Sequence, residues 1–138
     1  MASGVAPNIS WYDFRNDGTD PFNFEHNMGI LARDFHPKPA YRALATLTRM
    51  LGKATFSRAV DLGPDMVAYR FDRAGPGAGN VLVVWPIGDD RTATLKVPAD
   101  RPVTVVDLMG GRQVRTPQGE DLALPLRTET PVFLLLEK

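Results

Sequence analysis

The sequence predicts a mainly β fold: an antiparallel β-sandwich of about eight strands with one packed α-helix. Two observations lead to this prediction. From residue 54 onward, short β-prone runs alternate with Gly, Pro and Asp breakers, which is typical of antiparallel sandwiches. Before that point, only residues 38–52 show helical periodicity. The chain has 138 residues, 43% of them hydrophobic, and is therefore long enough to bury one core.

The N-terminal region is aromatic and acidic. The bulky, β-prone run from Ile9 to Phe14 predicts a short strand. Asp17-Gly18 and Asp20-Pro21 are turn signals, so we expect an irregular loop after this strand. Residues 9–36 hold half of the aromatic side chains of the chain: Trp11, Tyr12, Phe14, Phe22, Phe24 and Phe35.

Residues 38–52 predict a helix. Pro39 suits the first helical turn, where its missing N–H costs nothing, and Gly52 suits the end of the helix. One apolar face recurs at helical spacing, and we expect this face to pack against another part of the molecule. Its members are Tyr41, Leu44, Leu47 and Leu51.

The remaining sequence predicts eight strands separated by Gly, Pro and Asp. Successive apolar residues from Val81 to Trp85 indicate a central strand that is buried on both faces. The strands are expected at residues 55–60, 66–72, 80–86, 92–97, 103–108, 112–115, 121–126 and 132–137. We therefore divide the chain into an N-terminal part, 1–53, and a β-sandwich, 54–138.

The composition argues against several classes of partner. Sixteen Lys and Arg residues balance 16 Asp and Glu residues. A chain without net charge lacks the basic surface that binds nucleic acid or anionic lipid, so we expect neither partner. There is no cysteine for a disulfide or a thiolate site. Residues 1–7 have neither a basic region nor an apolar stretch, so they do not predict a secretory signal, and the localisation stays open.

The order of the N-terminal elements resembles a known enzyme group. A Trp11-Tyr12-Asp13 strand ending, a loop with Gly29-Ile30, and Lys38-Pro39-Ala40-Tyr41 opening a helix are similar to the last βα unit of clan-A glycoside hydrolases, particularly the family 39-like and cellulase-like enzymes. The runs 67–71, 81–85 and 128–133 are similar to the β-sandwich that those enzymes append. The resemblance implies that residues 1–53 are a remnant of the final barrel strand, loop and helix.

The same resemblance implies that the family's catalytic residues are missing. A complete (β/α)₈ barrel takes about 250 residues. In the family, an acid/base glutamate after an asparagine and a nucleophilic glutamate lie on strands four and seven of the barrel. This chain contains no Asn-Glu pair, so neither role can be assigned to any of its residues. The resemblance therefore implies an accessory fragment of a glycoside hydrolase.

A sugar-binding role is expected for Trp11, Tyr12 and Asp13. In the family, the tryptophan that ends the eighth strand lies under the sugar, where its flat apolar face matches the C–H face of a pyranose. The resemblance implies the same for Trp11, with a polysaccharide or oligosaccharide as partner. The alternative is that Trp11 packs against the helix at 38–52. A third interpretation of the chain is a purely structural β-sandwich that binds no ligand.

A second function class is a small stand-alone cellulase or xylanase. Glycoside hydrolysis needs two carboxyl groups, and the candidates here are Asp13, Asp17 and Glu25. Turn formation and helix capping by these side chains are the competing explanation.

A metal site is a further possibility. Calcium ligation by Asp17, Asp20 and Glu25 is conceivable, but their spacing departs from the twelve-residue calcium loop. His26 and His36 lack zinc-binding spacing. We expect no metal and no cofactor.

The sequence also predicts self-association. A solitary eighth barrel strand without its neighbours is an exposed edge, which pairs readily with another chain. We therefore expect a homo-oligomer that forms through the N-terminal strand, and a cleft lined by Trp11 and Asp13 from two chains is one possible catalytic arrangement.

Overall fold

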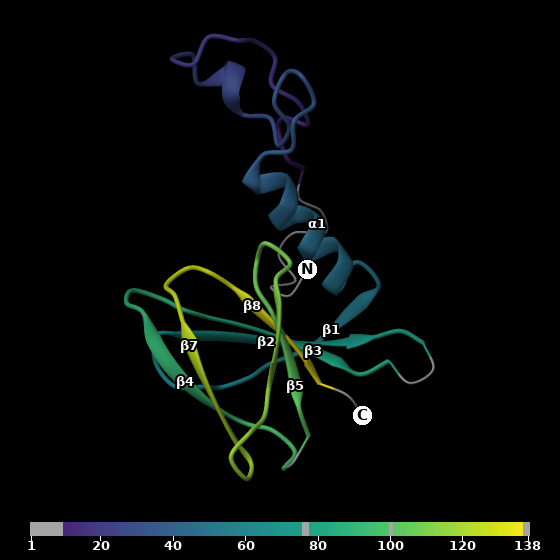
Figure 1. Cartoon of the computed structure of the whole chain (residues 1–138), viewed down its shortest axis with the longest axis vertical. Coiled ribbons are helices and arrows are strands. Elements are labelled where there is room, and N and C mark those ends of the chain that lie inside the picture. Colours follow the sequence, from purple (N-terminus) through teal and green to yellow (C-terminus); the bar gives the residue numbers. More distant parts are fainter. Residues whose placement is uncertain (1–9, 76–77, 100, 137–138) are drawn as a thin grey trace.

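The computed structural model describes residues 10–75, 78–99 and 101–136 (Figure 1). Within these residues the protein is mainly β, with one α-helix, one short 3₁₀ helix and eight strands, as the sequence predicts. No helix in this part of the chain is both long and apolar enough to cross a membrane. The elements are η1 (Glu25–Asn27), α1 (Pro39–Leu51), β1 (Ala54–Ala59), β2 (Met66–Arg73), β3 (Asn80–Pro86), β4 (Arg91–Lys96), β5 (Val103–Val106), β6 (Arg112–Arg115), β7 (Asp121–Leu126) and β8 (Val132–Leu136).

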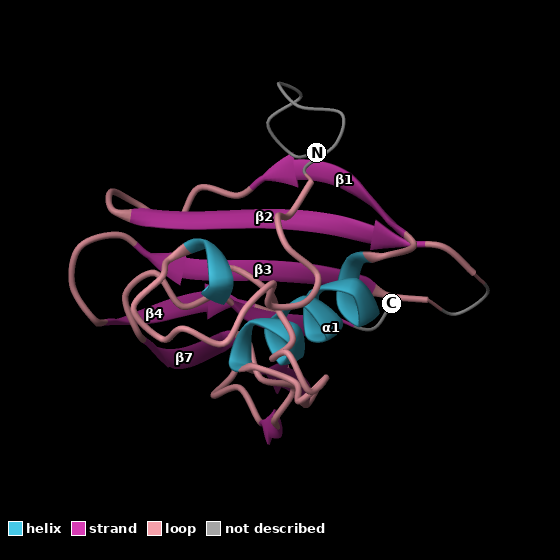
Figure 2. Cartoon of the chain, turned by 90° about the horizontal axis from the view of Figure 1, so that it is seen from above, coloured by secondary structure: helices cyan, strands magenta, loops and turns pink. Residues whose placement is uncertain are grey.

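The strands form two antiparallel sheets of unequal size. The larger sheet has the order β1-β2-β3-β8-β5-β6, and the smaller consists of β4 and β7. Residue Phe71 of β2 pairs with Val81 of β3, and Val83 of β3 pairs with Phe133 of β8, so the apolar strands lie at the centre of the larger sheet. β1, β2 and β3 lie side by side in this sheet (Figure 2). The predicted antiparallel sandwich is confirmed.

The main core lies between the two sheets. In β7 the leucines at 122, 124 and 126 are buried, whereas the alternating residues Ala123 and Pro125 are exposed. These leucines pack against Leu82, Val84 and Leu134 of the larger sheet. β3 is buried on both faces, as predicted, because a second apolar cluster covers its outer side.

The helix α1 packs on the outer face of the larger sheet through its last two turns. Met50 is buried in a cluster with Val81, Val83, Val106 and Phe133. Thr46, one turn earlier, is also buried. The rest of the helix extends away from the sandwich (Figure 1).

The predicted apolar face of the helix is therefore only partly correct. Tyr41, Leu44 and Leu47 are exposed, and Leu51 is half-buried. The reason is geometric: the sheet reaches only the C-terminal end of α1, so the side chains that face the sheet there are Thr46 and Met50. The first three positions of the predicted face remain uncovered within the described structure.

The expected strand over residues 9–14 is not formed. Ile9 lies outside the described residues, and 10–14 have no strand conformation. Instead, backbone hydrogen bonds link this segment to 28–31, including Ile30 N–H to Asp13 O at 3.0 Å and Leu31 N–H to Phe14 O at 3.0 Å. Arg15 and Leu31 form an isolated parallel bridge. A strand needs a regular partner, and this segment has only an irregular loop beside it.

Candidate functional site

The N-terminal segment, residues 10–38, forms a separate lobe at the end of α1 that lies away from the sandwich (Figure 1). Its aromatic side chains face solvent. Trp11 is 65% exposed and Phe22 is 96% exposed. Large exposed apolar groups that gather in one region mark interaction sites more often than core elements. We call the six exposed aromatic residues of this lobe the aromatic platform: Trp11, Tyr12, Phe14, Phe22, Phe24 and Phe35.

Trp11 lies on the surface and is not packed under the helix. Its indole N–H reaches the carbonyl oxygen of Met28, at 3.4 Å, in the neighbouring loop. This contact anchors one edge of the ring while most of its surface stays accessible. The alternative in which Trp11 packs against the helix is not what the structure shows.

Two carboxyl groups meet beside the platform. The Tyr12 hydroxyl donates a hydrogen bond to Asp17 Oδ2 at 2.9 Å. The hydrogen bond with the Asp13 carboxyl, followed by the one from Tyr12, lowers the pKa of Asp17 below its ordinary value. The same Tyr12–Asp17 hydrogen bond, helped by the negative charge of Asp17, raises the pKa of Tyr12. Asp17 is therefore an anion over a wide pH range.

Glu25 and His26 lie close to this pair, on η1. The positive potential of His26 contributes to the lowered pKa of Asp17, and the negative charge of Glu25 contributes to the raised pKa of Tyr12. A Cβ atom added to Gly18 would meet the His26 ring at 2.3 Å, so the ring lies directly against the turn that carries Asp17. The structure thus brings the three predicted carboxylate candidates to one side of the lobe.

Three polar residues hold the lobe together, and sequence reasoning missed all of them. Lys38 Nζ donates to Asn16 Oδ1 at 2.6 Å and to the Asn27 carbonyl oxygen at 2.9 Å. Asn16 is buried and also donates to Asn27 Oδ1 at 3.3 Å. Asn27 in turn donates to the carbonyl oxygens of Asp20 and Asn23, both at 2.8 Å. In the sequence, Lys38 was noted only as the first residue of the Lys38-Pro39-Ala40-Tyr41 run that opens the helix.

The exposed setting of the two aspartates does not suit the acid catalyst of glycoside hydrolysis. Retaining enzymes separate their two carboxyl groups by roughly 5 Å, and inverting enzymes by roughly 6.5–9.5 Å. The charges of Asp17 and Asp13 both raise the pKa of Tyr12, so the two carboxyl groups are neighbours on one exposed surface. The lobe is also open to water, whereas an acid catalyst needs a dry environment that raises its pKa. The pair is better suited to accept hydrogen bonds from sugar hydroxyls.

The candidate calcium ligands have other partners. Asp20 Oδ1 accepts the Phe22 N–H at 2.9 Å, in an Asx-turn, and Asp17 Oδ2 accepts a hydrogen bond from the Tyr12 hydroxyl. His36 donates its backbone N–H to Asp34 Oδ1 at 3.1 Å and lies outside the cluster. Across the described ranges, no three His, Asp or Glu side chains are arranged to hold a metal ion.

A comparison with solved structures finds a related protein. A family 39 glycoside hydrolase from the gut symbiont Bacteroides cellulosilyticus WH2 is similar to this chain, with a TM-score of 0.76 and 32% identical residues. The similarity covers 91% of this chain but only 25% of the other. No family model and no curated protein matches the chain.

This comparison supports the resemblance seen in the sequence. The chain spans about a quarter of the length of the solved glycoside hydrolase, and nearly all of its own length takes part in the match. The chain is therefore similar to one portion of a family 39-like glycoside hydrolase.

Proposed function

We propose that this chain is a non-catalytic accessory module of a family 39-like glycoside hydrolase, and that the aromatic platform binds polysaccharide. The observation that carries this proposal is the exposed Trp11, followed in the sequence by Tyr12, whose hydroxyl group donates a hydrogen bond to Asp17. A flat aromatic face and nearby hydrogen-bond acceptors are the two features that a pyranose ring requires, since it has an apolar C–H face and polar hydroxyl groups.

The aromatic side chains of the platform gain little stabilisation from burial unless a partner covers them. Full burial of a Phe-sized side chain stabilises a protein by about 1.5–3 kcal/mol. None of the six aromatic residues is fully buried in the described structure, so none of them contributes this full amount. A ligand or the remainder of a larger enzyme would cover part of this surface. Leu44 and Leu47 of α1 are also exposed. They suit a packing contact with the enzyme, while Trp11, Tyr12 and Asp13 suit the sugar.

The charge state of the site agrees with hydroxyl binding. Asp17 stays ionised because its pKa is lowered, and an ionised carboxylate only accepts hydrogen bonds. Tyr12 adds a phenol next to it. Charge-assisted hydrogen bonds of this kind are about twice as strong as neutral ones, so few contacts are needed to orient one sugar ring.

The alternative is a small stand-alone hydrolase that uses Asp13, Asp17 or Glu25. It keeps some support because the three carboxylates lie near one another. The lowered pKa of Asp17 favours the binding module over this alternative, because an acid catalyst needs a raised pKa.

The test is binding of the purified protein to β-glucan and xylan, measured by affinity electrophoresis. Trp11→Ala is expected to weaken retention at least about tenfold, the loss that corresponds to roughly 1.4 kcal/mol. Val114→Ala, which removes an equally exposed apolar side chain from β6, serves as the control and should leave retention unchanged. Equal loss in both variants, or no retention of the parent protein on any polysaccharide, would overturn the proposal.

A further inference from the structure

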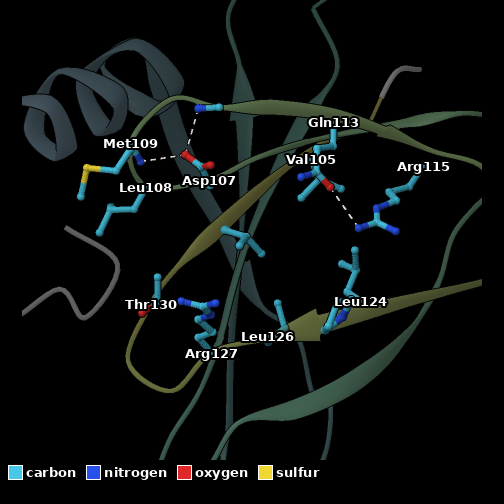
Figure 3. Close-up of a pocket in the computed structure, with 13 residues that line it drawn as sticks. Val105, Asp107, Leu108, Met109, Gln113, Arg115, Leu124, Leu126, Arg127 and Thr130 are labelled. Atoms are coloured by element: carbon cyan, nitrogen blue, oxygen red, sulfur yellow. Dashed lines mark hydrogen bonds between the residues drawn. The ribbon is translucent and has the colours of Figure 1, made fainter.

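A cavity of about 610 Å³ lies between β5, β6 and β7, but it offers a sugar ring no suitable face (Figure 3). Leu124 and Leu126, which line it, are each only 3% exposed, and none of the described lining residues is aromatic. Arg115 and Arg127 lie on opposite sides of these leucines. The aromatic platform is therefore the better place for a sugar, and its affinity depends on how firmly the fold holds Trp11.

Lys38 joins the lobe to the helix. Its backbone is extended and begins α1: its N–H donates to the carbonyl oxygen of Ile30 at 3.1 Å, and its own carbonyl oxygen accepts the Tyr41 N–H at 3.0 Å. The other end of α1 is fixed on the larger sheet by Met50. Because a helix is a rigid element, the sandwich sets the position of Lys38.

The ammonium group of Lys38 ties two separate stretches of the lobe to this fixed point. Nζ donates to Asn16 Oδ1 at 2.6 Å and to the Asn27 carbonyl oxygen at 2.9 Å. Both acceptors are uncharged, and within the described ranges no carboxylate forms an ion pair with Lys38. Hydrogen bonds from a charged donor are shorter and stronger than those between neutral groups, so Lys38 holds the two stretches more firmly than a neutral side chain would.

The carbonyl group that anchors Trp11 is the next one along the chain. The Trp11 indole N–H reaches the carbonyl oxygen of Met28 at 3.4 Å, and the Asp13 N–H shares this acceptor, also at 3.4 Å. Met28 directly follows Asn27, so the carbonyl oxygens bound by Lys38 and by Trp11 belong to consecutive residues. A displacement of Asn27 would therefore displace the anchor of the Trp11 ring.

We propose that Lys38 is a positioning residue of the aromatic platform: it holds the backbone of Asn27 and Met28 in place and thereby orients the Trp11 ring for a sugar. This inference rests on the proposed function, because it concerns the same site. A ring that is ordered before the ligand arrives loses less conformational freedom on binding, so the anchor raises affinity without any contact between Lys38 and the sugar.

The first measurement uses the full chain without a ligand. The chain has two tryptophans, so a nitrogen–proton correlation NMR spectrum should contain two indole N–H signals, and Trp11→Phe assigns them. Lys38→Met should move the Trp11 signal and leave in place the signal of Trp85, which lies on β3 and reports on the sandwich. Lys38→Arg, which keeps the charge and the donors, should return the Trp11 signal toward its parent position. Lys53→Met, the same substitution just beyond the other end of α1, should leave both signals unchanged.

The second measurement is retention on β-glucan and xylan by affinity electrophoresis. Lys38→Met should weaken retention about three- to tenfold, the loss expected when one side chain is no longer ordered before binding, and Lys53→Met should leave it unchanged. Because Lys38 acts through Trp11, adding Lys38→Met to Trp11→Ala should cause no further loss.

An unmoved Trp11 signal in Lys38→Met would overturn the inference, and so would losses of retention that add in the double variant. A third contrary result is a tyrosine titration in which Lys38→Met also abolishes the raised pKa of Tyr12, because Lys38 would then hold the whole lobe and not the ring alone. Absence of retention of the parent protein would overturn the proposed function, whereas a displaced Trp11 signal in Lys38→Met would still establish the anchor.

Discussion

The Tyr12–Asp17 hydrogen bond sets the protonation behaviour of the lobe at the scale of single residues. Because the pKa of Tyr12 is raised, the Tyr12–Asp17 hydrogen bond contributes fully to stability below about pH 10. This contribution is lost as the pH rises through the raised pKa. Because the pKa of Asp17 is lowered, the ionised Asp17 side chain contributes to stability at pH values above its ordinary pKa of 3.8. This contribution is lost as the pH falls through the lowered pKa. The lobe should therefore keep its structure throughout the neutral range.

A titration of the tyrosines by ultraviolet absorbance tests this contact. One of the three tyrosines should ionise above the ordinary value of 10.0, and Asp17→Asn should bring it back toward that value, because the negative charge that opposes ionisation is gone. Asp20→Asn, which removes a nearby charge without touching Tyr12, is the control. Identical titration curves for the parent and Asp17→Asn would contradict the contact.

At the scale of elements, α1 anchors the lobe through a single packed end. Met50→Ala should lower the free energy of unfolding by about 2–4 kcal/mol, since it opens a cavity against Val81, Val83 and Phe133. Leu44→Ala, on the exposed stretch of the same helix, should cost less than about 1 kcal/mol. Urea denaturation of both variants measures the difference. A larger loss for Leu44→Ala than for Met50→Ala would show that the helix packs through its predicted face instead.

The helix and the strands also show what the sequence could predict. The uninterrupted apolar run of β3 predicted a central strand that is buried on both faces, because successive side chains of a strand point to opposite faces of the sheet. Helical periodicity found α1 but predicted its buried face only in part, since Leu51 is half-buried while Leu44 and Leu47 are not covered by the sheet. The hydrogen-bonded group of Asn16, Asn27 and Lys38 has no sequence signature, because an irregular loop brings the three residues together.

The cavity between β5, β6 and β7 was equally invisible to sequence reasoning. It arises from the unequal size of the two sheets, and the order of strands across a sheet does not follow from the positions of strands along the chain. In the sequence, Arg115 and Arg127 look like ordinary surface charges. Only the structure shows that both of them line one cavity.

At the scale of the whole molecule, the lobe and the first turns of α1 extend away from the sandwich (Figure 1), and their aromatic and leucine side chains are exposed. Self-association through the N-terminal segment stays a prediction, and the segment that would mediate it is now an irregular backbone and not a regular strand. Sedimentation velocity should show an average mass that rises with concentration, and Phe22→Ser combined with Phe24→Ser should reduce this rise. A monomer at every concentration would contradict the prediction.

The central claim is that this chain, which is similar to one portion of a family 39 glycoside hydrolase, binds polysaccharide without cleaving it. The most direct measurement incubates the purified chain with β-glucan and xylan and records, in the same samples, the bound protein and the reducing ends released. The account predicts retention on polysaccharide and no release of reducing ends above a protein-free blank. Release of reducing ends that disappears in Asp13→Asn, Asp17→Asn or Glu25→Gln would contradict it and establish the chain as an enzyme.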